Sequence, residues 1–143
     1  MKKLILLDLD DTVVDLFGGL QKLWPDTHLN DNAWSICETL NITHKEFWAK
    51  ILEVPTFWED LEYTAWGREL VSFVKFKNDG ILKFVTAPTR CPEACRGKQR
   101  WIHKHFGEDF NGLTLTEDKT ICARPDHILI DDREYNLTAF QKA

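Results

Sequence analysis

The stretch that decides the fold is KLILLDLDDT, residues 3–12. Its apolar run at residues 4–7 is typical of a strand that is buried on both faces, as in the middle of a parallel sheet. Asp8 and Asp10 follow this run, and the period-two alternation of a strand turns both carboxylates to the same side. Two adjacent negative charges need a cation, and Mg²⁺ is a hard divalent ion that prefers carboxylate oxygens. An alternative interpretation is an acidic turn in which Asp11 or Thr12 caps a helix.

The bulk composition fits one small globular domain. The chain has 143 residues, of which 43% are hydrophobic, and this is enough for a single core with a small insertion. Its net charge of −5 and pI near 5.5 argue against binding to polymeric nucleic acid, because that binding depends on many Lys and Arg contacts. A single nucleotide is compatible with this charge.

The amino-terminal stretch and the cysteines indicate a cytoplasmic protein. The apolar run before Asp8 is too short for a signal peptide, and no stretch is long enough to cross a membrane. The cysteines include no C-x-x-C pair, so they are expected to be reduced thiols rather than zinc ligands or a disulfide framework.

Turn and periodicity signals divide the rest of the chain into alternating helices and strands. They predict helices over residues 13–20, 32–40, 43–52, 67–76 and 92–106. Short apolar runs predict further strands at residues 81–86, 113–116 and 127–132. Strands that alternate with helices favour right-handed crossovers and a mainly parallel α/β sheet.

Aromatic residues are dense between residues 30 and 66. They include Trp34, Phe47, Trp48, Phe57, Trp58 and Trp66. Bulky side chains can build the core of a small helical insertion, and this accounts for most of them. A second interpretation is that one or two of them line a pocket above the active site and stack on a flat ring.

The predicted strand ends carry the groups that phosphoryl transfer needs. In an open parallel sheet, functional residues gather at the carboxyl ends of the strands. Those ends are followed here by Asp8 and Asp10, by Thr86, by a segment with Lys119, and by Asp131 and Asp132. One carboxylate can attack phosphorus and another can transfer a proton, while a hydroxyl and an ammonium bind phosphate oxygens and an acidic pair holds Mg²⁺.

These residues occur in the order of the four motifs of a known superfamily. DLDDT at residues 8–12 resembles the DxDx(T/V) first motif of the haloacid dehalogenase (HAD) superfamily of phosphohydrolases. Thr86, Lys119 and the pair Asp131-Asp132 stand at the other three motif positions, so the resemblance covers nearly the whole chain.

The resemblance implies an architecture. It is a three-layer, Rossmann-like parallel sheet of the α/β class, the HAD fold, with a small helical cap inserted after the first strand. Residues 1–15 and 67–143 would form the catalytic core, and residues 16–66 would form the cap.

The same resemblance implies residue roles. Asp8 is the nucleophile that forms an aspartyl-phosphate, and Asp10 protonates the leaving oxygen and later activates water. Thr86, Ala87 and Lys119 bind the phosphoryl group.

The resemblance also implies a Mg²⁺ cofactor. The ion would lie between the Asp8 carboxylate, the backbone carbonyl of Asp10 and the last acidic pair. Asp132 would be the direct ligand of that pair, and Asp131 would support it.

Several stretches resemble the 5′(3′)-deoxyribonucleotidase family within that superfamily: FWEDL at 57–61, TAP at 86–88 with Lys98, Trp101 and HFG at 105–107 after it, LTEDKT at 115–120 and LIDDR at 129–133. This closer resemblance implies hydrolysis of a small-molecule phosphate ester, a nucleoside monophosphate and preferably a deoxyribonucleotide, with the base held by aromatic residues of the cap. The candidate pocket residues are Phe17, Phe57, Trp58 and, as an additional phosphate contact, Arg90.

Other functions stay open from the sequence. One is a HAD phosphatase for another small phosphate ester or a polynucleotide end, and another is a noncatalytic module that binds a phosphorylated metabolite. A homodimer is also left open. Two cations have ordinary interpretations. Lys98 could compete with Lys119 for the phosphate role, but its place inside a helix favours a solvated surface charge, and Arg133 is expected to pair with a neighbouring carboxylate.

Overall fold

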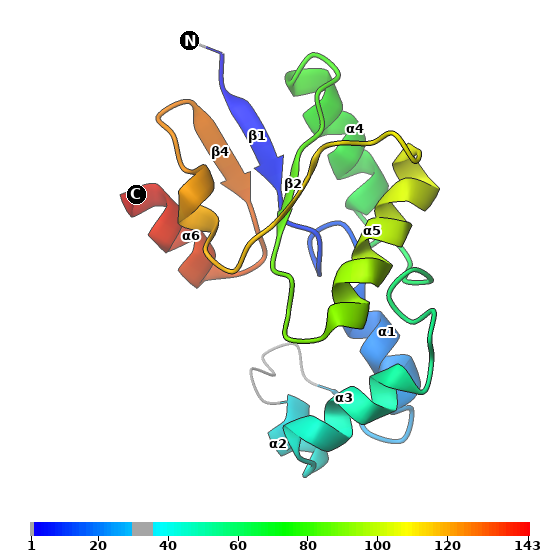
Figure 1. The fold of residues 1–143 in the computed structure, drawn as a ribbon. Coiled ribbons are helices and arrows are strands. Elements are labelled where there is room, and N and C mark those ends of the chain that lie inside the picture. Colours follow the sequence, from blue (N-terminus) through cyan, green and yellow to red (C-terminus); the bar gives the residue numbers. More distant parts are fainter. Residues whose placement is uncertain (1, 30–35) are drawn as a thin grey trace.

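The computed structural model describes residues 2–29 and 36–143 and shows a parallel sheet with helices on both faces (Figure 1). The strands are β1 (Leu4–Leu7), β2 (Phe84–Thr86), β3 (Leu113–Leu115) and β4 (His127–Ile130), in the order β3-β2-β1-β4. All neighbouring pairs are parallel, and β1 pairs with both β2 and β4. The predicted α/β class and the central place of the first strand are confirmed.

The helices alternate with these strands. They are α1 (Leu16–Leu23), α2 (Ile36–Leu40), α3 (His44–Leu52), α4 (Gly67–Lys77), α5 (Pro92–Phe106) and α6 (Glu134–Lys142), with a short 3₁₀ helix η1 (Lys119–Cys122). The predicted helix over 32–40 is described only from Ile36, and Trp34 lies outside the described residues. Helix α6 was not predicted. None of the described helices is both long and apolar enough to span a bilayer.

The sheet separates two apolar cores because side chains alternate along its strands. Leu7 and Phe84 belong to the larger core, which includes residues of α4 and α5 such as Trp101. Leu6 and Val85, their neighbours in sequence, belong to a second core that includes Phe140 of α6. The first strand is therefore buried on both faces, as its uninterrupted apolar run predicts.

Strand β2 is shorter than the predicted strand at 81–86, and a side chain explains why. The Asn78 amide Nδ2 donates to the Ile5 carbonyl at 2.9 Å, and Asn78 Oδ1 accepts from the Ile5 N–H at 3.0 Å. Asn78 is only 3% exposed. Its amide bonds to the edge of β1 that a longer β2 would otherwise pair with, so β2 meets β1 only at Phe84.

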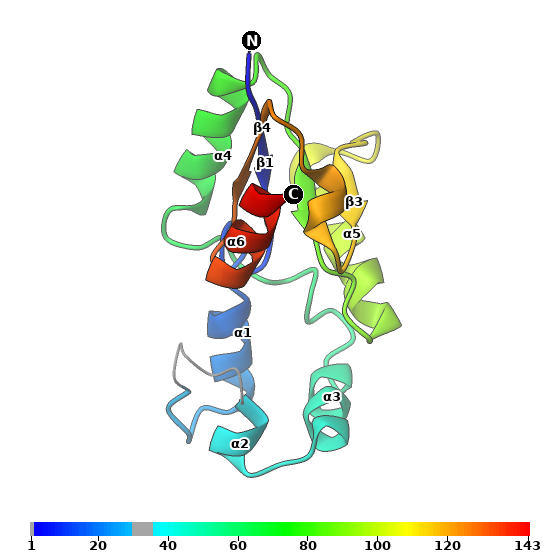
Figure 2. The same ribbon diagram turned by 90° about the vertical axis from the view of Figure 1, so that its left-hand side faces the viewer.

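Helices α1, α2 and α3 lie beyond the carboxyl ends of β1 and β2, whereas α4, α5 and α6 flank the sheet (Figures 1 and 2). The segment between β1 and α4 begins and ends at one place. The Thr64 N–H donates to the Val13 carbonyl at 2.9 Å, and Trp66 Nε1 donates to the Thr12 carbonyl at 2.8 Å. These bonds fix the helical segment next to the acidic stretch that follows β1.

Candidate active site

Three buried charged side chains from distant parts of the chain meet at the carboxyl edge of the sheet. Asp8 follows β1, Asp131 follows β4, and Lys119 begins η1. Lys119 Nζ lies 2.6 Å from Asp8 Oδ1 and 2.5 Å from Asp131 Oδ2. All three residues are at most 9% exposed. One ammonium thus offsets two carboxylates that have been removed from water, which a buried charge requires.

Asp131 has both carboxylate oxygens engaged by protein groups. Its Oδ1 accepts from the backbone N–H of Arg133 at 2.9 Å, and its Oδ2 accepts from Asn136 Nδ2 at 2.9 Å in addition to Lys119. Asp132, the next residue, is exposed. The more accessible carboxylate of the pair is therefore that of Asp132.

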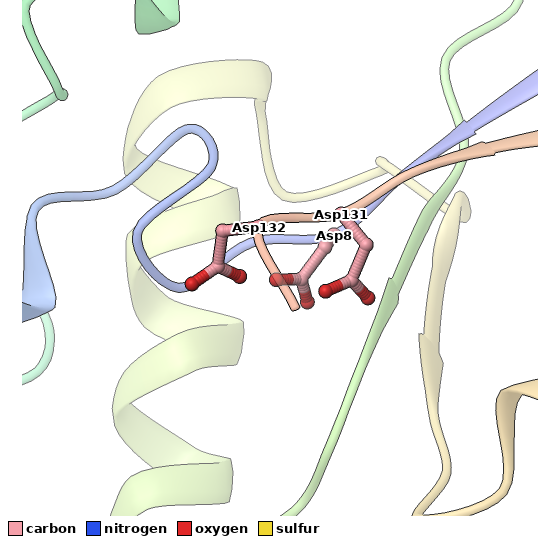
Figure 3. Close-up of side chains that lie close together, drawn as sticks. All are labelled: Asp8, Asp131 and Asp132. Atoms are coloured by element: carbon pink, nitrogen blue, oxygen red, sulfur yellow. The ribbon is translucent and has the colours of Figure 1, made fainter. Parts of the chain in front are cut away.

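Asp8, Asp131 and Asp132 form an acidic group that could hold a metal ion (Figure 3). One carboxylate oxygen from each lies within 4.8 Å of the others, and the three side chains project side by side from the ends of β1 and β4. The donor atoms are all carboxylate oxygens, which is the ligand chemistry of hard cations such as Mg²⁺. The residues present therefore fit the ion that the sequence predicts.

The electrostatics of this group follow from burial. Desolvation raises the pKa of Asp8 from 3.8 to about 8; the Lys119 ammonium opposes the rise and the Asp131 carboxylate adds to it. Burial works against the Lys119 ammonium, but Asp8 and Asp131 outweigh it and raise the Lys119 pKa above its usual value. Without a further cation, negative charge on Asp8 is therefore costly.

A second lysine lies in the same site, and the sequence interpretation of it was wrong. Lys98 was expected to be a solvated charge on the surface of a helix, yet it is only 2% exposed. Its Nζ donates to Asp10 Oδ2 at 2.6 Å, to the Ala87 carbonyl at 2.7 Å and to Thr86 Oγ1 at 3.2 Å. It lies four residues after Ala94 and three before Trp101, on the buried face of α5, and this helical spacing was a signal that the sequence interpretation did not use.

A cavity of about 280 Å³ opens over these groups. Its polar wall includes Asp8, Asp10, Thr86, Ala87, Thr89, Glu117, Lys119, Arg133, Tyr135 and Asn136. Its apolar wall comes mainly from α1, α2, α3 and the segment before α4, through Leu16, Leu20, Ile36, Phe47, Trp48, Ile51 and Trp58. The space is thus polar at the sheet edge and apolar and aromatic on the helical side, which suits a ligand with a phosphate at one end and a flat ring at the other.

Comparison with known families decides the assignment. The family model for 5′ nucleotidase, deoxy (Pyrimidine), cytosolic type C protein matches residues 2–143. The chain belongs to this family. A search of curated proteins found no match. Membership makes the chain a 5′-nucleotidase, which is a phosphoric monoester hydrolase, and it confirms the resemblance seen in the sequence.

The four candidate pocket residues of this nucleotidase differ in where they lie relative to the cavity. Trp58 is in the cavity wall. Phe57 lies in the larger core and packs edge-on against Trp58, with ring centroids 5.2 Å apart. Phe17 is partly buried against the same core, and its backbone N–H donates to Asp11 Oδ1 at 2.8 Å. Arg90 is exposed and directly follows Thr89, which lines the cavity.

Several residues of the nucleotidase site were assigned no role from the sequence, although Thr12 belongs to the first motif. Asn136 holds Asp131, and Thr12 Oγ1 donates to Asp8 Oδ2 at 3.3 Å. Phe47 and Trp48 of α3 were noted only for their aromatic density. The available signals were short sequence distances: Thr12 is four residues from Asp8, and Asn136 is five residues from Asp131. Such spacings occur throughout any chain and do not reveal a function by themselves.

Proposed function

We propose that this nucleotidase is a Mg²⁺-dependent phosphatase that hydrolyses nucleoside monophosphates, preferably deoxyribonucleotides, through an aspartyl-phosphate on Asp8. The observation that carries the proposal is that one cavity has a polar end and an aromatic end. Asp8, Asp10, Thr86 and Lys119 lie at its polar end, and aromatic side chains line its other end. We also propose that the enzyme acts in the cytosol, in keeping with the family description.

The polar end supports the first half of the reaction. An Asp8 oxygen attacks phosphorus, and the ester P–O bond breaks. Among the described residues Lys119 donates to two acceptors, which leaves its third N–H for a phosphoryl oxygen. Thr86 and the adjoining Ala87 would supply further contacts to the phosphoryl group.

Asp10 carries the proton in this scheme. It protonates the departing nucleoside oxygen in the first half-reaction and accepts a proton from the attacking water in the second. It lines the same cavity as Asp8, which lies two residues before it at the same strand end.

The metal ligands would be the carboxylates of Asp8 and Asp132 and the backbone carbonyl of Asp10. When bound, Mg²⁺ supplies positive charge that offsets the charge of the phosphate and of the nucleophilic carboxylate. Asp131 would support this site by holding Lys119, since its oxygens already accept from three protein groups.

The helical segment would act as a cap for the substrate. We propose that residues 16–66 form this cap on a core of residues 1–15 and 67–143, and that Trp58 and the aromatic residues of α3 hold the base. The cavity of about 280 Å³ is of the size expected for a small ligand rather than a polymer.

The test is phosphate release from a panel of ribo- and deoxynucleoside monophosphates, with Mg²⁺ or with EDTA. We expect release that requires Mg²⁺, is fastest on deoxyribonucleotides and is lost in Asp8→Asn. The matched control is Asp109→Asn, because Asp109 is exposed in the loop after α5 and does not line this cavity.

Each part of the proposal fails in a separate way. Equal rates on sugar phosphates would remove the nucleotide preference while keeping the mechanism. Unchanged activity in EDTA would remove the metal, and an active Asp8→Asn variant would remove the aspartyl-phosphate.

A further inference from the structure

Lys98 is a buried ammonium whose place in the reaction is set by its contacts. It is 2% exposed, in the middle of α5, and its partners belong to two other segments. Asp10 comes from the stretch after β1, and Thr86 and Ala87 come from the end of β2. An ammonium removed from water needs compensation from charge or hydrogen bonds, and these acceptors provide both.

The number of donors limits what Lys98 can do. A lysine ammonium has three N–H bonds, and Lys98 Nζ has three acceptors, at 2.6 Å, 2.7 Å and 3.2 Å. All three N–H bonds are therefore used within the protein. Lys119 differs, because in the part of the chain that the structure describes it has two acceptors, which leaves one N–H for a ligand. The two lysines of the site are not equivalent, and Lys98 has no donor left for a phosphate oxygen.

The bond to Thr86 has a direct consequence for that hydroxyl. A threonine hydroxyl has one proton and can accept as well as donate. Since Thr86 Oγ1 accepts from Lys98, its own proton is available to donate into the cavity that Thr86 lines. The phosphoryl group offers only acceptor oxygens, so this orientation is the one that can bind it.

We infer that Lys98 is a positioning residue that holds the Asp10 carboxylate in a fixed position relative to Thr86 and Ala87, the proposed phosphate contacts at the end of β2. This inference rests on the proposed function. In the first half-reaction the Asp8–phosphorus bond forms, the ester bond breaks and the leaving oxygen takes the proton of Asp10. In the second, water attacks phosphorus, its proton passes to Asp10 and the Asp8–phosphorus bond breaks. Lys98 acts in both halves only through Asp10 and Thr86.

The leaving group provides a test that a general loss of structure would not imitate. p-Nitrophenolate leaves without a proton, whereas a nucleoside alkoxide needs one. With Lys98→Met and p-nitrophenyl phosphate, we expect a rapid burst of about one nitrophenolate per active site followed by slow turnover, because only the second half-reaction then needs Asp10. With a deoxynucleoside monophosphate, we expect no burst and a rate lower by about 100-fold.

Three further proteins make the result decisive. Lys104→Met is the matched control, since Lys104 is an exposed lysine of the same helix, and it should behave as the wild type. In a background that carries both Asp10→Asn and Thr86→Val, which removes the two groups through which Lys98 acts, Lys98→Met should change the burst rate and the half-saturating substrate concentration by no more than about threefold, because residues that act as a unit are not additive. If Lys98→Met is recovered unfolded, Lys98→Gln serves in its place, because it removes the charge and keeps amide donors.

Two results would overturn the inference. One is an equal loss on both substrates without a burst. The other is a tenfold or greater rise in the half-saturating substrate concentration in the background that lacks both the Asp10 carboxylate and the Thr86 hydroxyl, because a loss of about one charged hydrogen bond there would make Lys98 a direct phosphate ligand. Failure of the proposed function would be seen elsewhere, in a wild type that does not turn over or in an Asp8→Asn variant that still does.

Discussion

Asp131 and Asp132 are adjacent in the sequence but have different environments. The Asp131 side chain is fully buried and accepts from Lys119, Asn136 and the Arg133 amide. Asp132 is exposed as a residue. The surrounding protein still removes part of the water from its carboxyl group, and this desolvation raises the pKa of Asp132. A charged group that is buried and paired contributes mainly to the integrity of the site, whereas an accessible carboxylate is free to bind an ion.

We therefore expect the two asparagine variants to differ. Asp132→Asn should raise the Mg²⁺ concentration for half-maximal activity by about tenfold or more, with little change in the stability of the metal-free protein. Asp131→Asn should lower the unfolding free energy by about 2 kcal/mol, because it removes one of the charges that compensate buried Lys119. Mg²⁺ titration of activity and urea unfolding in EDTA measure the two effects, and the opposite assignment would contradict this division of roles.

At the scale of elements, the first residues of β1 are held by the side chain of Asn78 instead of by strand β2. Asn78, at the end of α4, bonds to both the N–H and the carbonyl of Ile5 in β1. These backbone groups have no β2 partner at that level, because the pairing of β1 with β2 begins at Leu7. The asparagine thus links α4 to β1 in place of strand pairing.

Asn78→Ala should lower the unfolding free energy by about 2 kcal/mol, since it leaves two partly buried backbone groups of Ile5 without their side-chain partner. Urea unfolding measures the change, and Asn111→Ala, at an exposed loop asparagine, is the control. A loss similar to that of the control would show that water replaces the amide without cost.

Helix α5 approaches the segment before α4 closely. A methyl group added at Gly97 would lie 2.2 Å from Trp58 Cβ, a position that side-chain rotation cannot move away. Trp101 Nε1 also donates to the Leu61 carbonyl at 2.9 Å, so the same face of α5 holds this segment at two points.

Gly97→Ala should therefore displace Trp58 from the cavity wall. We expect a loss of about 1–3 kcal/mol in unfolding free energy and a higher KM for nucleotides. Gln99→Ala, at an exposed position of the same helix, should change neither quantity. A KM unchanged in a stable Gly97→Ala protein would show that the position of Trp58 does not affect nucleotide binding.

At the scale of the whole molecule, the ionisation of the site links folding to pH. Burial raises the pKa of Asp8 to about 8 and that of Asp11 to about 6, above their usual 3.8. The folded, metal-free protein therefore keeps protons that the unfolded chain releases, so stability is lost as the pH rises through the folded pKa values. His105, whose pKa burial lowers from 6.5, has the opposite effect, but only at lower pH.

In EDTA, the unfolding free energy should decrease as the pH rises from about 6.5 to 8, because folded Asp8 loses its proton in this range whereas unfolded Asp8 has already lost it. Asp8→Asn should remove most of this slope. Mg²⁺ should stabilise the protein more at the upper end of the range, because the ion binds the carboxylate form. Urea unfolding at several pH values measures the slope, and a rise in stability over this window would contradict the cause assigned to it.

The local sequence determined the position of the central strand and the ends of several helices. The apolar run before Asp8 forms the predicted central strand. The turn residues Asn78-Asp79-Gly80 directly follow α4, and Thr43 and Glu46 form a capping box at the start of α3. Each depends on periodicity or on hydrogen bonds between near neighbours, which a single sequence records. The resemblance of the motifs to a phosphohydrolase superfamily also needed only the order of residues.

The tertiary structure decided which side chains meet. Lys98 and Asp10 are 88 residues apart, and Asp8 and Lys119 are 111 apart. The shortening of β2 likewise depends on a contact between Asn78 and Ile5 across 73 residues. Local propensity fixes the helix or strand that carries a residue, but the rotation and packing of that element decide whether a lysine is solvated or is buried against a carboxylate. For this reason the sequence alone determined the strands and their acidic ends, and only the packing of α5 against the sheet placed Lys98 in the site.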